Sequence, residues 1–258
     1  MAAPADAWSP PFTWEERLKY ALVPASLYIR YRAAKEWCRG EREVHLLSHL
    51  VDPARVSVDV GANKGVYSYF LRRRSRHVHA FEPNPKLFSV LQRTMGRSSN
   101  VTLSPLALAD RTGEAELRVP QRASGFSNQG SSLSAVKVSD NFRSVTVRTS
   151  RLDDLDISNI GFIKIDVEGF ESQVLQGARK TIARDRPVLL IEMEERHRSQ
   201  PIEAAIAEVE DLGYRGLALH RGHLIDLTGF DAERQHRAPA SPADYINNFI
   251  FLPVGPRD

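Results

Sequence analysis

The sequence predicts an α/β fold in which helices cover both faces of a doubly wound, mainly parallel sheet. Two observations carry this prediction. Apolar, β-branched runs alternate with segments of helical periodicity from Arg55 onwards, and a glycine-rich turn directly follows the first such run. A chain of 258 residues with 42% apolar and 26% charged residues can bury one sizeable core. We therefore expect one α/β unit with additions.

The strand and helix patterns follow one another in two stretches of the chain. Short apolar runs predict strands, and apolar residues recurring every three or four positions predict helices. In the first stretch the expected elements are strands 55–60, 77–81 and 101–104, a helix from Lys64 and a helix over 85–95. In the second stretch they are strands 161–166, 187–193, 213–220 and 245–253, and helices over 174–185 and 201–212.

Three segments depart from this alternation. Residues 1–50 mix aromatics, aliphatics and arginines at roughly helical spacing, interrupted by Pro24, and are expected to form a helical extension to the main unit at 51–258. Alternating runs between Gly, Ser and Asn clusters predict a β insertion over 114–149, with strands in ELRVP, SSLSAVKV and SVTVRTS. The polar stretch 229–244 is expected to be an exposed loop.

Composition and charge exclude several classes of protein. The single cysteine, Cys38, excludes an internal disulfide and a cysteine-based zinc or iron–sulfur site. No secretory signal begins the chain, and no apolar run reaches about 18 residues, so we expect a cytoplasmic protein. The net charge is only +3. The cluster RRRSR at 72–76 falls where a helix should end, and cations there complement the helix dipole, so no nucleic-acid partner is expected.

The stretch VSVDVGANKG, residues 56–65, places a glycine turn at the end of the first predicted strand. In doubly wound sheets the ligand lies beyond the carboxyl ends of the strands, and Gly61 and Gly65 allow the backbone to approach it closely. Glu82 ends the second strand, where a carboxylate can accept hydrogen bonds from both hydroxyls of an unphosphorylated ribose. Up to this point NAD and S-adenosylmethionine satisfy the pattern equally.

Spacing and charge separate these two cofactors. The turn reads G-x-x-x-G and lacks the G-x-G-x-x-G fingerprint of dinucleotide sites. Asp59 beside the turn and Asp166 at a nearby strand end would repel a pyrophosphate, whereas S-adenosylmethionine carries an ammonium and a sulfonium. The sequence therefore favours the sulfonium cofactor. In a simpler interpretation the glycines only shape a strand–helix connection and Asp59 caps the helix, but this leaves Glu82 unexplained.

Five blocks of the sequence resemble one family of enzymes. VDVGANKGVYSYFL, AFEPNP, LSPLALADRTGEAEL, IKIDVEGFESQVLQGA and RPVLLIEMEERH are similar, in this order, to the FkbM family of S-adenosylmethionine-dependent methyltransferases. The similarity runs from about Glu43 to the final NFIFLP, and the DVGAN and IDVEGFE blocks are more specific than the general class I pattern. The resemblance implies a Rossmann-like class I methyltransferase fold and methyl transfer to an oxygen of a sugar, polyketide or other small molecule.

The resemblance also implies roles for individual residues. The residues that would line the methionine end of the cofactor are Asp59, Gly61, Asn63 and Gly65. Glu82 would hold the ribose, and Ala107 with Leu108 would border the adenine. Asp166 would face the cofactor's ammonium or the reaction centre.

The acceptor requires a further group, because an aliphatic hydroxyl is a poor nucleophile until its proton leaves. The candidate catalytic residues follow two strand ends and are Asp166, Glu168, Glu192 and His197. Asp166 and Glu192 are also candidates for holding Mg²⁺, which prefers oxygen ligands. Simpler roles stay open, because acidic residues favour helix starts and histidines are common on surfaces. Lys164 shares a strand face with Asp166, so we expect an ion pair there.

We therefore predict an O-methyltransferase that acts on a hydroxyl of a glycan or natural-product small molecule. An NAD-linked oxidoreductase and a non-catalytic cofactor- or sugar-binding module remain the alternatives. The N-terminal aromatic residues leave four interpretations open: packing on the core, a cover for the acceptor pocket, a homo-oligomer contact, or peripheral membrane contact through residues 1–40. The acceptor walls are expected in the segments outside the motifs.

Overall fold

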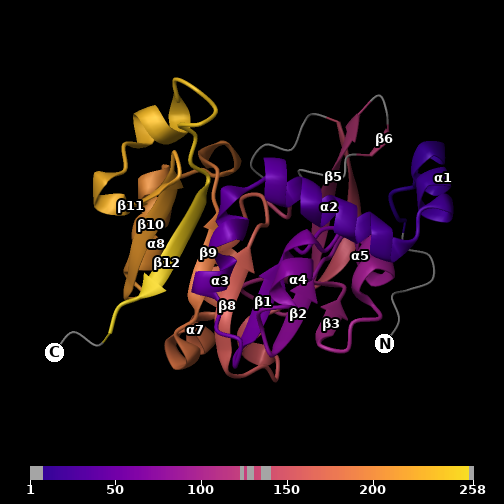
Figure 1. Ribbon diagram of the computed structural model, residues 1–258, viewed down its shortest axis with the longest axis horizontal. Helices are drawn as coiled ribbons and strands as arrows, with labels where there is room; N and C mark the ends of the chain where they lie inside the picture. Colours follow the sequence, from indigo (N-terminus) through magenta and orange to yellow (C-terminus); the bar gives the residue numbers. More distant parts are fainter. Residues whose placement is uncertain (1–7, 123–124, 127–130, 135–140, 256–258) are drawn as a thin grey trace.

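Five short runs pair in parallel along one side of an eight-stranded sheet, up to its edge strand β3 (Figure 1). The structure, a computed structural model, describes residues 8–122, 125–126, 131–134 and 141–255. The strand order is β11-β10-β12-β9-β8-β1-β2-β3, and all pairs from β3 to β9 are parallel. The bounds of the parallel strands are β1 Val56–Val60, β2 His77–Phe81, β3 Val101–Ser104, β8 Ile160–Ile165 and β9 Val188–Glu192. The predicted doubly wound, mainly parallel sheet is therefore confirmed.

The far side of the sheet is antiparallel. β12 (Asn248–Pro253) runs antiparallel to β9 and to β10 (Tyr214–His220), between which it lies. β11 (His223–Asp226), which the sequence did not predict, pairs with β10 as a hairpin. This order departs from the 3-2-1-4-5-6 arrangement of dinucleotide-binding sheets, because the last strand of the chain enters between two earlier ones.

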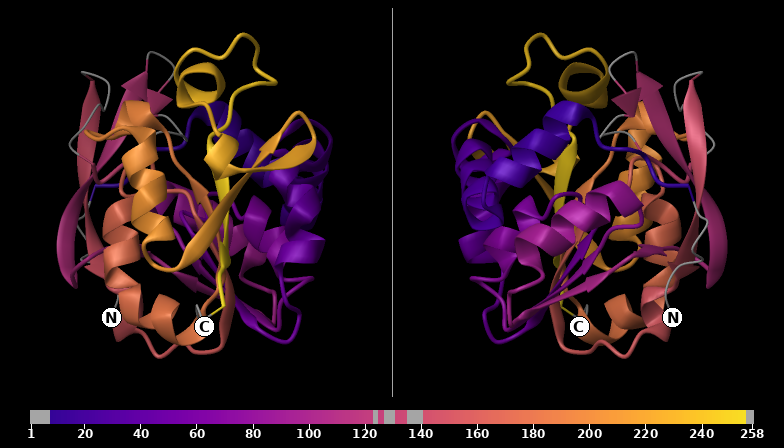
Figure 2. Two further views of the ribbon diagram at one scale, coloured as in Figure 1. Left: turned by 90° about the vertical axis from the view of Figure 1, so that its left-hand side faces the viewer. Right: turned by 90° about the vertical axis from the view of Figure 1, so that its right-hand side faces the viewer.

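Alternate residues of the central strands point into two hydrophobic cores. Ile163 and Ile165 of β8 belong to the first core, with side chains from α6 (Glu171–Gly177), α7 (Arg179–Asp185) and α8 (Ile202–Glu210). Phe162 belongs to the second core, with side chains from α2 (Ala25–Arg39), α4 (Val66–Leu71) and α5 (Pro85–Met95). Figure 2 shows the orange helices and the purple helices on opposite sides of the sheet. All six residues of β8 are buried because both faces of the sheet are covered.

The first part of the N-terminal section forms two helices that meet at Pro24. α1 (Trp14–Leu22) begins at a capping box between Thr13 and Glu16, and α2 begins directly after Pro24, whose ring interrupts the helical run. Glu16 also forms an ion pair with Lys86 of α5, with 2.8 Å between Oε2 and Nζ. Since α2 contributes side chains to the same core as α4, this section packs on the sheet unit and shares its core. None of the helices that the structure describes has the length and apolar character needed to cross a membrane.

The β insertion forms a second sheet. Its order is β4-β7-β5-β6, with bounds β4 Leu106–Leu108, β5 Gly113–Arg122, β6 Gly125–Phe126 and β7 Phe142–Ser150. The strand expected in SSLSAVKV does not form at its start, where Ser132 makes only an isolated bridge to Arg118. Residues 135–138 of that segment lie outside the described part of the chain. Apolar side chains of β5 and β7 that form a separate small core are Leu117, Val119, Val145 and Val147.

Two segments differ from the expectations. The helix expected over 174–185 is divided into α6 and α7, because the backbone leaves helical geometry at Ala178 (φ −114°, ψ 5°). The stretch 229–244, expected to be an exposed loop, contains a π-helical turn over Glu233–Arg237 with a buried His236. His236 donates through Nδ1 to the Ile246 carbonyl at 2.7 Å and accepts at Nε2 from the Glu195 amide at 3.0 Å. The prediction of an exposed loop is wrong at this turn, because a histidine that bridges two backbone segments holds it in place.

Candidate active site

A cavity of about 200 Å³ lies at the carboxyl ends of the parallel strands. Its walls come from the ends of β1, β2, β8 and β9, from β4, and from the insertion. Five acidic residues line it: Glu41, Glu82, Asp166, Glu168 and Glu192. The lining residues that the structure describes include no Lys, Arg or His. The cavity therefore has a negative electrostatic character that suits a cationic ligand.

The glycine turn after β1 depends on two close approaches of the backbone. Gly61 has a φ of 81°, and a Cβ at this position would lie 1.9 Å from the carbonyl oxygen of Asp166. Only glycine fits there, because any other residue would meet both the strained φ and the clash. Gly65 has a φ of 87° and allows α4 to pack on α5, where a Cβ would lie 2.8 Å from Leu91. The turn is held to β2 because the amides of Gly61 and of the next residue both donate to the Phe81 carbonyl, at 3.0 and 2.9 Å.

Glu82, at the end of β2, is fixed by two backbone amides. One carboxylate oxygen accepts from the Asn63 amide and the other from the Asn84 amide, both at 2.8 Å. Burial raises the pKa of Glu82 to about 7, and although the two hydrogen bonds oppose this shift, the charges of Asp166 and Asp59 add to it. The carboxylate is thus held rigidly in the cavity wall with part of its acceptor capacity unused.

Lys164 is a buried ammonium in the middle of the acidic cluster. It is 1% exposed, and its Nζ lies 3.8 Å from Asp166 Oδ2 and 3.8 Å from Glu192 Oε2. The Tyr67 ring covers it, with 5.0 Å from Nζ to the ring centroid. Burial opposes its charge, but the carboxylates of Asp166, Glu41 and Glu192 hold the pKa of Lys164 above its ordinary value. The expected Lys164–Asp166 pair is present, and the contact with Glu192 adds a second partner.

Asp166 and Glu192 share the charge of one ammonium. Burial raises the pKa of both carboxyls, and the charge of Lys164 opposes this effect only in part. The side-chain amide of Asn247 donates through Nδ2 to Glu192 Oε1 at 2.9 Å, which fixes the orientation of that carboxylate. This end of the cavity therefore favours a protonated carboxyl until additional positive charge enters.

The turn between β8 and α6 carries Glu168 to the cavity. Glu168 has a φ of 52° and Gly169 a φ of 93°, and a Cβ on Gly169 would lie 2.3 Å from the carbonyl oxygen of His197. Glu171 holds the turn, because it accepts from the Gly169 amide at 2.6 Å and pairs with Arg198. His197 Nε2 lies 3.1 Å from Glu168 Oε2, and this contact raises the pKa of His197. The turns that follow β8 and β9 are thereby locked together.

The site does not fit the expected Mg²⁺. Within the described residues, no group of three or more His, Cys, Asp or Glu side chains is arranged to hold a metal ion. The Lys164 ammonium contacts both Asp166 and Glu192 and supplies the positive charge that a metal would bring. The predicted metal site at these two carboxylates is therefore not supported.

Comparison with known families decides the kind of enzyme. Residues 59–215, more than half of the chain, match the model of the methyltransferase FkbM domain. The chain belongs to the FkbM methyltransferase family. Membership confirms the family predicted from the sequence blocks, and with it a methyltransferase that uses S-adenosylmethionine.

Similar proteins support the same family. The 2-O-methyltransferase NoeI of Sinorhizobium fredii is 28% identical over 182 residues, which are 62% of this chain and 74% of that protein. The hexuronic acid methyltransferase AglP of Haloferax volcanii is 30% identical over 146 residues, which are 54% of this chain and 56% of that protein. The crystal structure of an FkbM methyltransferase from Methylobacillus flagellatus superposes with a TM-score of 0.51 at 20% identity, covering 89% of this chain and 55% of that one. The last likeness shows the shared fold.

Most of the residues predicted from the resemblance or from their strand-end positions meet at the cavity. Those that line it are Gly61, Asn63, Glu82, Ala107, Leu108, Asp166, Glu168 and Glu192. Asp59 lies in an adjoining hollow, where it is buried and accepts from the Ser68 hydroxyl at 2.5 Å. Gly65 is the residue directly before α4 and lies against α5, and His197 reaches the cavity only through its contact with Glu168. The roles assigned to all these residues stay predictions.

The sequence patterns did not reveal Glu41 and Tyr67 as members of this site. Glu41 lies just before a 3₁₀ turn (Arg42–Leu46) and α3 (Leu47–Leu50), yet it lines the cavity and accepts from the Tyr67 hydroxyl at 2.5 Å. Glu36 holds Glu41 in place by accepting from its amide at 2.9 Å. No motif spacing marks Glu41, because its position depends on how α2 packs across the sheet. Other lining residues that were not predicted include Ser131, Leu133 and Phe170.

Replacing Gly61 tests the close approach of the turn to β8. We expect Gly61→Ala to lower the free energy of unfolding by about 2–5 kcal/mol, because the new Cβ adds a clash with the Asp166 carbonyl to the strain of a positive φ. Gly222→Ala is the matched control, because Gly222 also has a φ of 87° but a Cβ added there would lie 3.8 Å from its nearest neighbour, a nitrogen of Arg42. This substitution should lower the free energy of unfolding by only about 1–2 kcal/mol. Urea unfolding measures both values, and equal losses would show that the clash has no consequence.

Proposed function

We propose that this FkbM-family protein transfers the methyl group of S-adenosylmethionine to a hydroxyl oxygen of a sugar, in a glycan or a sugar-containing small molecule. The observation that carries the proposal is the set of five carboxylates around the cavity at the strand ends, with no basic side chain among the described lining residues. S-adenosylmethionine brings an electrophilic methyl group on a sulfonium, together with an ammonium. The name of NoeI, a 2-O-methyltransferase, supports transfer to an oxygen, and the name of AglP, a hexuronic acid methyltransferase, supports a sugar acceptor.

The strand ends offer complementary groups for each part of the cofactor. Glu82 is assigned to the ribose, because its carboxylate is held by backbone amides and can accept two more hydrogen bonds. Ala107 and Leu108 form an apolar part of the wall and are assigned to the adenine. The backbone of the glycine turn and the Asp166 carboxylate are assigned to the methionine end, where a carboxylate would face an ammonium.

Glu192 is assigned as the group that accepts the proton of the acceptor hydroxyl. Its side chain lines the cavity, and Asn247 orients it through Oε1. Burial together with the charge of Asp166 raises the pKa of Glu192 to about 9, and the ionised form of a more basic carboxylate takes up the proton of a hydroxyl more readily. The second requirement is alignment of the acceptor oxygen behind the methyl group, and orientation of this kind supplies much of the acceleration in such displacements.

The proposed reaction is tested by incubating the protein with S-adenosylmethionine labelled in its methyl group and a panel of mono- and oligosaccharides. Label in a sugar product, at a position identified by mass spectrometry, is the expected result. Thermal unfolding gives an independent readout, because a ligand of the native state raises the melting temperature. We expect S-adenosylmethionine to raise it and NAD to leave it unchanged. Stabilisation by NAD alone would overturn the assignment.

The affinity for S-adenosylmethionine should depend on pH through Glu82. The native pKa of about 7 lies above the ordinary value, so Glu82 is largely protonated below pH 7, and the ribose hydroxyls bind best to its ionised form. Binding should therefore tighten by about tenfold between pH 6 and pH 8, as the ionised fraction rises. Isothermal calorimetry measures this change. Glu82→Gln should bind S-adenosylmethionine more weakly, and its affinity should not increase between pH 6 and pH 8. Glu203→Gln, at an exposed position, should show the affinity and the pH dependence of the wild type.

Glu192→Gln separates proton removal from cofactor binding. We expect kcat to fall by about 100-fold or more, because general bases contribute on this scale. The affinity for S-adenosylmethionine should change by less than about threefold, since the variant keeps the shape of the side chain. The rate of the wild-type enzyme should rise with pH across neutrality, because the raised pKa leaves Glu192 protonated at lower pH, and this rise should disappear in the variant. An unchanged kcat would exclude Glu192 as the base.

A further inference from the structure

Both N-terminal helices expose large apolar side chains. Trp14, Leu18 and Leu22 recur every fourth residue on α1, and Leu27 and Tyr31 continue at the same spacing on α2. Trp14 and Leu22 are each 72% exposed and Tyr31 is 64% exposed. Residues four apart lie on the same side of a helix, so each helix presents an apolar stripe to the outside. We call these five residues the N-terminal stripe.

The stripe faces outward because the opposite sides of both helices are anchored. On α1, Glu16 is buried in its ion pair with Lys86, and Tyr20 is buried against Tyr28 of α2 with 5.4 Å between the ring centroids. On α2, Ile29 is 2% exposed in the core that it shares with the sheet. Rotation of either helix to hide its stripe would break these contacts. The apolar residues are thus held at the surface by the fold itself.

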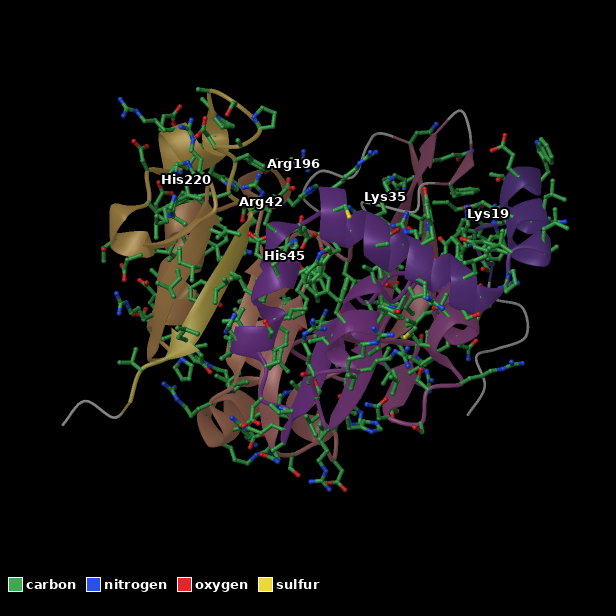
Figure 3. The ribbon with its side chains drawn as sticks, viewed as in Figure 1. Lys19, Lys35, Arg42, His45, Arg196 and His220 are labelled. Atoms are coloured by element: carbon green, nitrogen blue, oxygen red, sulfur yellow. The ribbon has the colours of Figure 1, made fainter. Side chains whose placement is uncertain are left out.

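The exposed charges on the same helices are almost all positive. The exposed basic residues of α1 and α2 are Arg17, Lys19, Arg30, Lys35 and Arg39. Glu15 is the single exposed acid of these two fully described helices, because Glu16 is buried and Glu36 is half-buried. Figure 3 shows Lys19 on α1 and Lys35 on α2. By helical spacing, Arg30 and Lys35 flank the stripe on α2 on its two sides.

We propose that the N-terminal stripe and its flanking cations dock on a membrane surface that contains anionic lipids. Apolar and aromatic side chains with basic residues along the edges are the composition of helices that lie in the plane of a bilayer interface. A second copy of this chain fits less well, because a two-fold contact would bring the basic flanks of both copies together with only one exposed acid on each side. Anionic headgroups match the cations, and the acyl boundary accepts the stripe.

The docking surface lies on the back of the cofactor site. The inner side of α2 supplies Arg32 and Glu36 to the hollow that adjoins the cavity, and Gly61, Asn63 and Asp166 line both spaces. The same helix therefore forms a wall of the adjoining hollow on one side and the docking surface on the other. Membrane attachment would hold the active site close to the lipid surface whichever acceptor the enzyme methylates.

Vesicle co-sedimentation tests the proposal on the full chain. We expect binding to vesicles of phosphatidylcholine with phosphatidylglycerol to be at least about tenfold tighter than to phosphatidylcholine alone, and to weaken as salt is added. The double variant Leu18→Ser/Leu27→Ser should lower the affinity by about tenfold or more. Leu224→Ser is the matched control, because Leu224 and Leu18 are both 50% exposed and Leu224 lies on β11, at the far edge of the sheet. It should bind vesicles as wild type.

A second set of variants tests how much the basic side chains contribute to vesicle binding. Arg30→Gln and Lys35→Gln should each weaken binding to the anionic vesicles by about fivefold, whereas Arg97→Gln, at an exposed position beyond α5, should not. Emission from Trp14 should shift to shorter wavelength on vesicle binding, and the shift should shrink in Trp14→Phe. Calorimetric titration with S-adenosylmethionine confirms that each variant is folded.

Three results would overturn the proposal. The first is equal affinity for neutral and anionic vesicles, and the second is wild-type vesicle binding by Leu18→Ser/Leu27→Ser. The third is a wild-type dimer in analytical ultracentrifugation that this double variant dissociates, in the absence of vesicle binding. That result would identify a second copy of the chain as the occupant of the stripe.

Discussion

The confinement of five carboxylates around one small cavity is the constraint on which the rest of this structure depends. Parallel strands bring most of it about, because β2, β8 and β9 end at the same edge of the sheet, where Glu82 and Asp166 follow β2 and β8 and Glu192 ends β9. Glu168 lies in the turn after β8, and Glu41 comes from the N-terminal section. Like charges at this separation repel, and burial strengthens the repulsion. Lys164 reduces this repulsion, because its buried ammonium lies 3.8 Å from a carboxylate oxygen of both Asp166 and Glu192. In the proposed function, the positive charge of the bound cofactor completes this neutralisation.

The same neutralisation decides which chemistry the site can support. A divalent metal would compete with Lys164 for the same two carboxylates, and a pyrophosphate would meet five of them. An ammonium and a sulfonium have the opposite sign and need no extra counter-ion. Burial raises the pKa values of several of these carboxyls, so they can take up a proton near neutral pH. A group that removes the proton of a hydroxyl needs this property.

Several elements could be predicted because their signals are local. The bounds of β2, α5 and β3 agree with the expectations, since the two strands are marked by a local alternation of apolar and polar residues and α5 by a cap, with Asn84 accepting from the Lys86 amide. The glycine turn and Glu82 could also be predicted as parts of the site, because they follow two successive strands within about 25 residues of sequence. The failures were non-local. The turn that holds His236, the break at Ala178 and the position of β12 depend on contacts between distant segments.

The sequence by itself determined the class of the fold, the family and the strand-end acids that line the cavity, because a strand's apolar run and the side chain at its end are adjacent in the chain. Only the tertiary structure decided that Lys164 contacts Glu192 as well as Asp166, that Glu41 reaches the cavity from the N-terminal section, and that His197 meets Glu168 beside the cavity instead of lining it. It also decided which N-terminal aromatics are buried and which are exposed. All of these features depend on contacts between residues that are far apart in sequence. Such contacts are set by which strands become neighbours and by how each helix is rotated against the sheet.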